Sequence, residues 1–327
     1  MNPKKTKYNI QISIVIPLLN EEESLQELHE WIVRVMRAEN YRYEILFIDD
    51  GSTDKSWDII EKLSAENPCV KALRFSRNYG KSQALHAGFK EVKGQVVITM
   101  DADLQDAPDE IPALYEKIVT EKYDLVSGWK KKRFDSKIRK NIPSKLFNWA
   151  ARKVSGISLN DFNCGLKAFD IKVVKAIDVE GEMHRYIPLL AKDAGFEKIA
   201  EQVVQHQARK YGETKFGMER FVNGFLDLLT LWFVSRFGKR PMYLFGFAGT
   251  LAFLFGLIAT IYLGASKLIA VFYLQKPAPL VTDNPLFYIA LTCMVLGTQL
   301  FLAGFLGELI LRSKKKTKNY KTIQEIL

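Results

Sequence analysis

Two aspartates separated by one small residue, Asp101 and Asp103, are the clearest indication of chemistry in this sequence. They follow the apolar run Val96–Met100, which is typical of a buried strand. Two carboxylates at the edge of an apolar core repel each other unless a cation compensates them. Mg²⁺ and Mn²⁺ prefer oxygen ligands and are often shared with substrate phosphates, so the pair predicts a divalent cation held together with a diphosphate. An isolated Asp-x-Asp also occurs in solvated turns, so its neighbours must decide between the two interpretations.

A second acidic pair, Asp49 and Asp50, ends another apolar run and is followed by Gly51. One carboxylate of this pair is expected to hydrogen-bond the ribose or base of a nucleoside, and the other to cap the turn. The sequence contains no GxxxxGK[ST], GxGxxG or HExxH pattern, which argues against a P-loop ATPase, a dinucleotide oxidoreductase and an HExxH hydrolase. What remains is group transfer from a nucleoside diphosphate.

The elements that must position these residues alternate between apolar runs and amphipathic segments, which predicts an α/β fold with a doubly wound, mostly parallel sheet. Predicted strands are Ile12–Pro17, Glu44–Asp49, Val70–Phe75, Val96–Asp101 and Leu125–Gly128. Predicted helices are Glu22–Ala38, Thr53–Glu66, Lys81–Val92 and Pro108–Lys122, the last opened by Asp106 as its N-cap. Ligands in such sheets bind at the carboxyl ends of the strands, and the polar clusters all fall there.

Four segments in order carry a resemblance to a known family: Ile14–Glu21, Asp49–Asp54, Asn78–Lys81 and Asp101–Gln105. They resemble the inverting family 2 glycosyltransferases with the GT-A (Rossmann-like) fold. Within that family the sequence is most similar to the polyprenyl- and dolichyl-phosphate sugar transferases of the bacterial type with two C-terminal transmembrane helices. No Gln-x-x-Arg-Trp motif follows the catalytic domain, which argues against a processive polysaccharide synthase.

The resemblance implies roles for individual residues. Those implied to bind the nucleotide sugar are Pro17, Asn20, Glu21, Asp49, Lys81, Asp101, Arg209 and Lys215. Those implied to hold Mg²⁺ or Mn²⁺ are Asp101, Asp103 and Gln105. Those implied to be catalytic are Asp103, Asp161 and Arg209, with Arg209 and Lys215 closing over the diphosphate.

The segment Asn160–Phe169 resembles the part of the family that places an acid near the acceptor. Here Lys167 stands where the family usually has Arg, and Asp161 is equally well explained as a turn residue. Between Lys130 and Lys145 eight of sixteen residues are basic. Such a run is usually a solvated loop, but beside a membrane it fits the phosphate of a lipid acceptor, and the candidate ligands are Arg133, Arg139 and Lys140.

Two uncharged stretches, Pro241–Ser266 and Asn284–Gly307, are long enough to cross a bilayer as helices, whereas buried core helices of this length are rare. Basic residues flank their outer ends, which places both ends in the cytoplasm. The stretch Phe216–Phe237 has helical apolar spacing and fits either an interfacial helix or a helix packed on the soluble domain. The expected division is a catalytic domain at 1–215, a juxtamembrane linker at 216–240, a transmembrane pair at 241–311 and a basic tail at 312–327.

The chain carries 47 Lys and Arg against 37 Asp and Glu, a net charge of +10 that we assign to anionic lipid rather than nucleic acid. We therefore expect a multi-pass protein of the inner (plasma) membrane with its catalytic domain in the cytoplasm. It would transfer a sugar, with inversion, from a nucleotide sugar, UDP favoured over GDP, to a polyprenyl phosphate, undecaprenyl favoured over dolichyl. The alternatives are a sugar-phosphate nucleotidylyltransferase and a non-catalytic nucleotide-binding membrane subunit. Glycines in both spans permit close helix contacts, including those of a homo-oligomer.

Overall fold

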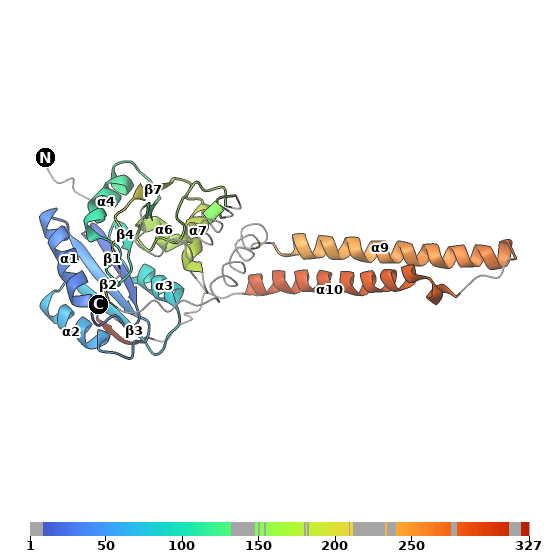
Figure 1. Ribbon diagram of the computed structural model, residues 1–327, viewed down its shortest axis with the longest axis horizontal. Helices are drawn as coiled ribbons and strands as arrows, with labels where there is room; N and C mark the ends of the chain where they lie inside the picture. The colour runs from blue at the N-terminus through green and yellow to red at the C-terminus, as the bar shows by residue number, and fades with distance from the viewer. Residues whose placement is uncertain are drawn as a thin grey trace. The chain divides into compact units, whose positions relative to one another are not determined.

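The computed structural model describes residues 9–131, 148–149, 151–153, 155–179, 181, 183–208, 210–211, 233, 240–275, 280–313 and 322–326. The chain divides into two compact units. One contains residues 1–231 together with 318–327, and the other contains residues 232–317. In Figure 1 the first unit is the α/β body and the second contains the two long helices.

An eight-stranded sheet forms the centre of the first unit, with the order β7-β5-β6-β4-β1-β2-β3-β8. Its strands are β1 (Ile12–Leu18), β2 (Tyr43–Asp49), β3 (Val70–Phe75), β4 (Val96–Thr99), β5 (Leu125–Trp129), β6 (Lys167–Asp170), β7 (Ile199–Val203) and β8 (Thr322–Ile326). All run parallel except β6 and β8, which pair antiparallel with their neighbours. The mostly parallel sheet predicted from the sequence is confirmed.

Helices cover both faces of this sheet, as Figure 1 shows. They are α1 (Leu25–Ala38), α2 (Ser56–Glu66), α3 (Lys81–Glu91), the 3₁₀ turn η1 (Pro108–Glu110), α4 (Ile111–Val119), α6 (Ile171–Ala176), the 3₁₀ turn η2 (Met183–Tyr186) and α7 (Ile187–Asp193). One apolar core joins the sheet to α1, α2 and α4, and a second joins it to α3, α6 and α7. The β1 strand divides its side chains between them, because Ile14 lies in the first core and Val15 in the second.

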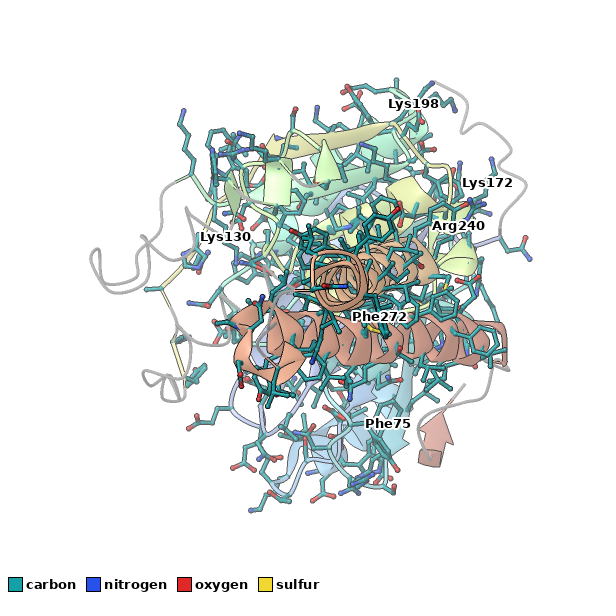
Figure 2. The ribbon with its side chains drawn as sticks, turned by 90° about the vertical axis from the view of Figure 1, so that its right-hand side faces the viewer. Phe75, Lys130, Lys172, Lys198, Arg240 and Phe272 are labelled. Carbon is teal, nitrogen blue, oxygen red and sulfur yellow. The ribbon has the colours of Figure 1, made fainter. Side chains whose placement is uncertain are left out.

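The five predicted strands and four predicted helices are present, with shifted ends. The fourth strand ends at Thr99 rather than Asp101, so both aspartates of the Asp-x-Asp pair lie in the turn that follows it. The sequence did not predict β6, β7 or β8. The last of these comes from the segment expected to be a basic tail. It pairs with β3, which carries Phe75 (labelled in Figure 2), and the register places Thr322 opposite that residue.

A buried carboxylate lies at the opposite edge of the sheet from the Asp-x-Asp turn. Glu44, at the start of β2, accepts hydrogen bonds from the Ser13 hydroxyl at 2.5 Å, the Lys93 N–H at 2.7 Å and the Lys71 ammonium at 2.9 Å. Burial acts to raise the pKa of Glu44, but these three donors outweigh it and the pKa is lowered. Glu44 therefore joins β1, β2, β3 and the turn before β4 as an ion.

The second unit is built from two long apolar helices, α9 (Met242–Leu268), continued by the π-helical turn η3 (Ile269–Tyr273), and α10 (Pro285–Ser313), preceded by η4 (Val281–Asp283). Both are long and apolar enough to cross a membrane. They pack together through glycines: a Cβ on Gly297 would lie 2.6 Å from the Gly249 oxygen. Most other apolar side chains of the pair are exposed, and Phe272 (Figure 2) is 76% exposed. The predicted interfacial stretch 216–237 lies outside the described residues except for residue 233.

Candidate active site

The candidate site lies at the edge of the sheet where the parallel strands end. Because β1 pairs in parallel with β2 and β4, and β2 with β3, the loops after all four strands meet at this edge. The β6 strand runs the other way, so its start lies here together with the ends of β5 and β7. The predicted convergence of the polar loops at one edge is confirmed.

The loops after β1 and β2 are hydrogen-bonded to each other. The Asn20 N–H donates to the Ser52 hydroxyl at 2.9 Å, and the Asn20 side-chain oxygen accepts from the Thr53 N–H at 2.8 Å. The Glu21 N–H donates to the Ser56 hydroxyl at 3.0 Å. Asn20 has a φ of +56°, in the left-handed region that Asn tolerates better than most residues. Asn20 and Glu21 thus fix the shape of this part of the site, and their nucleotide contacts remain predictions.

The two aspartates at the end of β2 have different partners. Asp49 is fully buried; it accepts the Ser52 N–H at 2.8 Å and lies 3.4 Å from the Arg74 guanidinium. Asp50 accepts the N–H groups of Tyr79 and Gly80 at 2.7 and 2.9 Å, which fixes the loop after β3. Burial raises the pKa of Asp50, and the Asp49 charge adds to this effect. Pro17 is also buried. Contacts of Pro17 and Asp49 with the nucleotide remain predictions.

Gly51 shows why these loops need a residue without a side chain. Its φ is +79°, and a Cβ at this position would lie 2.4 Å from the Arg77 carbonyl carbon. Both the backbone conformation and the close approach of the neighbouring loop therefore require glycine.

The Lys81 ammonium, at the start of α3, forms an ion pair with the Asp101 carboxylate, which follows β4. About a third of each side chain is exposed, 36% for Lys81 and 33% for Asp101, so both are accessible from solvent. Burial acts to raise the pKa of Asp101, but Lys81 and then Lys130 outweigh it and lower the pKa to about 2. The same pair works against burial at Lys81 and raises the pKa of its ammonium. Two residues predicted to bind the nucleotide are thus brought into contact.

Asp103 and Gln105 lie in the same tight turn as Asp101. The Gln105 N–H donates to the Asp103 carboxylate at 3.2 Å, and Leu104 between them is buried with a φ of +62°. Among the described residues no three His, Cys, Asp or Glu side chains form a metal-binding group by themselves. Mg²⁺ commonly takes only one or two carboxylates and completes its shell with water and substrate phosphate. Two partly exposed carboxylates in one turn fit that kind of site.

The prediction that Asp106 caps the fourth helix is wrong. The residue preceding η1 is Ala107, and the fully buried Asp106 carboxylate instead lies 2.7 Å from the Lys130 ammonium. No sequence pattern indicates this pair, because Asp106 follows β4 and Lys130 follows β5.

The segment before β6 reaches the site through its backbone. A Cβ on Gly165 would lie 2.6 to 2.8 Å from three atoms of the Asp101 carboxyl group, so glycine lets the chain pass directly beside that group. Lys167 is 4% exposed and donates to the Cys164 carbonyl; burial and then Lys81 lower its pKa, opposed by Cys164 and Asp161. Asp161 is buried and accepts the Asn163 N–H at 3.1 Å, which favours the turn interpretation and leaves its catalytic role a prediction.

One histidine that the sequence did not single out lies beside this cluster. The Ser82 hydroxyl accepts the His184 N–H at 3.0 Å and lies 3.1 Å from Nδ1 of the same residue. Burial and then the positive charge of Lys81 lower the pKa of His184 to about 3. His184 is therefore neutral at physiological pH. His184 is recognised as part of the site only from the structure, in which η2 lies next to the start of α3.

Five predicted site residues lie outside the described residues. They are the acceptor-phosphate candidates Arg133, Arg139 and Lys140 and the diphosphate candidates Arg209 and Lys215. The chain just before Arg209 is described: Gln207 N–H donates to the Gln105 carbonyl at 3.0 Å, and His206 forms an isolated β-bridge with Asp106. These two contacts bring the segment that leads to Arg209 against the Asp-x-Asp turn.

The sequence is similar to a known protein family and to characterised relatives. Residues 13–177 match the model of glycosyl transferase family 2. A dodecaprenyl-phosphate galacturonate synthase of Rhizobium johnstonii is 31% identical over 307 residues, covering 93% of this chain and 89% of that protein. An undecaprenyl-phosphate 4-deoxy-4-formamido-L-arabinose transferase of Shewanella sediminis is 36% identical over 320 residues, covering 97% and 92%.

Solved structures share the fold. Glucosyl-3-phosphoglycerate synthase from Mycobacterium tuberculosis, in complex with Mn²⁺, UDP and glucosyl-3-phosphoglycerate, aligns with a TM-score of 0.53 at 18% identity. The alignment covers 69% of this chain and 80% of that one. At this identity the match supports the fold alone.

Proposed function

The chain belongs to glycosyl transferase family 2 and is a glycosyltransferase, and from this premise we propose that it transfers a sugar from a nucleotide sugar to a polyprenyl phosphate. The observation that carries the proposal is the contact of Lys81 with Asp101 beside Asp103, at the edge where six strand ends meet. The two relatives above are named for this class of acceptor, and they align with this chain over almost its whole length.

The proposed step is an in-line displacement at the anomeric carbon. A phosphate oxygen of the lipid forms the new bond to that carbon from one face. The bond from the carbon to the β-phosphate oxygen breaks on the other face, and the nucleoside diphosphate leaves with the electron pair. The configuration is inverted. Because the nucleophile is already an anion, the step needs no strong base, so positioning and charge compensation supply most of the rate enhancement.

The residues of the Asp-x-Asp turn would bind the donor diphosphate through a metal. Asp101, Asp103 and Gln105 would hold Mg²⁺ or Mn²⁺, which supplies positive charge for the leaving diphosphate when bound. Lys81 holds the Asp101 carboxylate in its ionised form, and its partly exposed ammonium would also be available to a phosphate of the donor. His184 stays neutral beside it and adds no further charge.

The two apolar helices support a location at the membrane where the lipid acceptor resides. Their exposed apolar side chains would face acyl chains rather than water. Since β8 belongs to the sheet of the first unit, the chain leaves that unit before α9 and rejoins it after α10. Two membrane crossings, one by each helix, would return the chain to the side from which it started. Basic residues next to the outer ends of both helices favour the cytoplasmic side of the inner membrane for the first unit.

We further propose UDP over GDP as the nucleotide and undecaprenyl phosphate as the lipid. The relative named for undecaprenyl phosphate supports the choice of lipid, and the structural neighbour that shares the fold is itself a protein that binds UDP with Mn²⁺. Arg133, Arg139 and Lys140 remain the candidates for the acceptor phosphate, and Arg209 and Lys215 those for the diphosphate. The catalytic domain is proposed to extend from residue 1 to about 215, with the strand β8 added to its sheet.

The test is transfer of a radiolabelled sugar by the purified full chain in lipid nanodiscs. Undecaprenyl phosphate is supplied with Mn²⁺ and a panel of UDP- and GDP-sugars, and products are extracted into organic solvent. The expected product is a labelled lipid that releases its sugar in mild acid. In a separate incubation with a labelled sugar 1-phosphate and UTP or GTP, formation of a nucleotide sugar and pyrophosphate would instead support a nucleotidylyltransferase. Nucleotide binding without any product across the panel would support a non-catalytic subunit.

A further inference from the structure

An ion pair that the proposed reaction does not use lies directly behind the Asp-x-Asp turn. Asp106 is fully buried, and the Lys130 side chain (Figure 2) is only 12% exposed. The Asp106 carboxylate oxygen and the Lys130 ammonium are 2.7 Å apart. Asp106 follows β4 and Lys130 follows β5, and β6 lies between these strands in the sheet. The pair therefore joins two loops across the start of β6.

The Asp106 residue also contacts the turn that carries Asp101 and Asp103. Its second carboxylate oxygen accepts the Asp101 N–H at 3.4 Å, and its backbone bridges to His206. On the far side, the chain at Gly165 passes directly beside the Asp101 carboxyl group, since a Cβ on that glycine would lie 2.6 to 2.8 Å from it. Asp101 is thus fixed between a backbone on one side and Asp106 on the other.

Lys130 has two carboxylates within reach of its charge. Burial acts to lower the pKa of Lys130, but Asp106, followed by Cys164 and Asp101, outweighs it and raises the pKa. Lys130 is in turn the second positive charge, after Lys81, that lowers the pKa of Asp101. Loss of either partner would leave the other as a buried, unpaired charge, and the loops that the pair joins would then have to shift around the Asp-x-Asp turn.

We propose that Asp106 is a positioning residue, whose buried carboxylate holds Lys130 and the Asp101 backbone in place and so keeps Asp101 and Asp103 available to a divalent cation. The inference rests on the proposed function, because it assumes that this turn binds a metal together with the donor nucleotide. Asp106 acts through its neighbours and touches neither substrate nor metal. Groups of this kind around metal sites typically contribute about 10- to 100-fold to metal affinity.

The test measures Mn²⁺ binding rather than turnover. Free Mn²⁺ is followed by electron paramagnetic resonance with the full chain in detergent, in the presence of UDP and separately of GDP. We expect Asp106→Asn to weaken Mn²⁺ binding about tenfold or more. Lys130→Met should weaken it to a similar extent, and the double variant no further than the weaker single variant, because the two residues act as one unit. Lys130→Arg, which retains the charge, should bind within about threefold of the wild type.

Two matched controls separate positioning from general loss of stability. Asp170→Asn removes a carboxylate that accepts the Lys172 N–H at 2.9 Å at the other end of β6. Lys175→Met removes an ammonium that donates to the Phe89 carbonyl at 2.9 Å. Both should lower the melting temperature without changing Mn²⁺ affinity. If Asp106→Asn does not fold, the comparison of Lys130→Met with Lys130→Arg carries the test.

The outcomes are distinct. Wild-type Mn²⁺ affinity in Asp106→Asn and Lys130→Met overturns the positioning role and leaves the proposed function standing. Additive losses in the double variant also overturn it, since they would mean that Lys130 binds the ligand independently of Asp106. No Mn²⁺ binding by the wild-type chain with either nucleotide overturns the proposed metal site and the positioning role together.

Discussion

The Lys81 ammonium and the Asp101 carboxylate, twenty residues apart in the chain, are in contact at the carboxyl edge of the sheet. This contact compensates the negative charge of one member of the Asp-x-Asp pair and holds its pKa far below the usual range. Asp103, two residues away, lies on the same turn with a partly exposed side chain. The two carboxylates of the pair therefore start from different electrostatic environments, and the variants below use that difference.

Replacing Asp103 with asparagine should abolish metal-dependent transfer. The substitution keeps the shape and the hydrogen bond from the Gln105 N–H, but it removes the charge that a divalent cation needs. We expect a loss of about 100-fold or more in kcat, measured by the nanodisc assay with Mn²⁺. The control is Asp58→Asn on the exposed face of α2, which should turn over normally. Near-normal turnover of Asp103→Asn would refute the role of this carboxylate.

Replacing Lys81 with methionine should change stability in a pH-dependent way. The pKa of Asp101 is lowered in the folded chain, so the pair stabilises the fold above the unfolded pKa of about 3.9 and loses that effect as the pH falls towards 2. Because both partners are about a third exposed, we expect at most about 1 kcal/mol.

The measurement is the melting temperature of wild type and Lys81→Met between pH 7 and pH 2.5. The difference between them should be about 2–4 °C or less at pH 7 and should shrink as the pH falls. A difference that stays constant over this range would contradict the assignment of the effect to Asp101.

A methyl group at Gly165 should disturb Asp101 without disturbing the fold elsewhere. In Gly165→Ala the new Cβ would meet the Asp101 carboxyl group at 2.6 Å, so the carboxylate or the segment before β6 must shift. We expect Mn²⁺ and nucleotide affinity to fall about tenfold. Gly264→Ala in α9, where a Cβ meets nothing within 4 Å, is the control and should bind as the wild type does. Equal affinities in both variants would show that Asp101 is not confined from this side.

The sequence predicts those parts of the site that depend on residues close together in the chain, and it does not predict contacts between residues far apart in the chain. The strands β1 and β2 are almost wholly buried, and β3 is buried except at Lys71 and Arg74, so the ends of these strands could be predicted closely and the polar loops placed at one edge. The β7 strand is partly exposed along its length and shows no such run, so it was missed.

Asp106 shows the limit of sequence reasoning at a single residue. A polar residue before a proline-initiated helix is a good cap by local rules, and those rules contain no information about Lys130, 24 positions later. The same holds for Gly165, whose role depends on the carboxylate of Asp101 lying beside it. Pairings of this kind appear only when the sheet order is known.

Replacing Glu44, at the amino ends of the strands and away from the site, should lower the stability of the fold and leave the activity unchanged. Glu44→Gln removes a buried charge that three donors satisfy and leaves the Lys71 ammonium without its ion-pair partner. We expect a loss of about 2–4 kcal/mol in the free energy of unfolding of the first unit, with normal KM values in the folded fraction.

The pH dependence of this effect has a definite sign. The folded pKa of Glu44 is lowered, so its contribution is present above its unfolded pKa and is lost as the pH falls through the folded pKa. Denaturant unfolding of the wild type and Glu44→Gln at pH 7 and pH 3 should therefore give curves that lie closer together at pH 3. Glu30→Gln, on the exposed face of α1, is the control and should change neither. An equal separation at both pH values would mean that the carboxylate is not stabilised as an ion.

The pairing of β8 with β3 predicts an effect of the far C-terminus on the sheet. Placing proline at residue 324 removes a backbone N–H and disfavours the antiparallel register that pairs Arg74 with Gln324. The edge of β3 should then be exposed, and amide hydrogen exchange in Val70–Phe75 should become faster.

Gln324→Thr, which favours strands, is the control and should protect β3 as the wild type does. Because β1 and β2 separate β3 from β4, the strand that the Asp-x-Asp turn follows, transfer activity per folded molecule should be retained in both variants. Unchanged exchange in the proline variant would show that β3 is protected without β8.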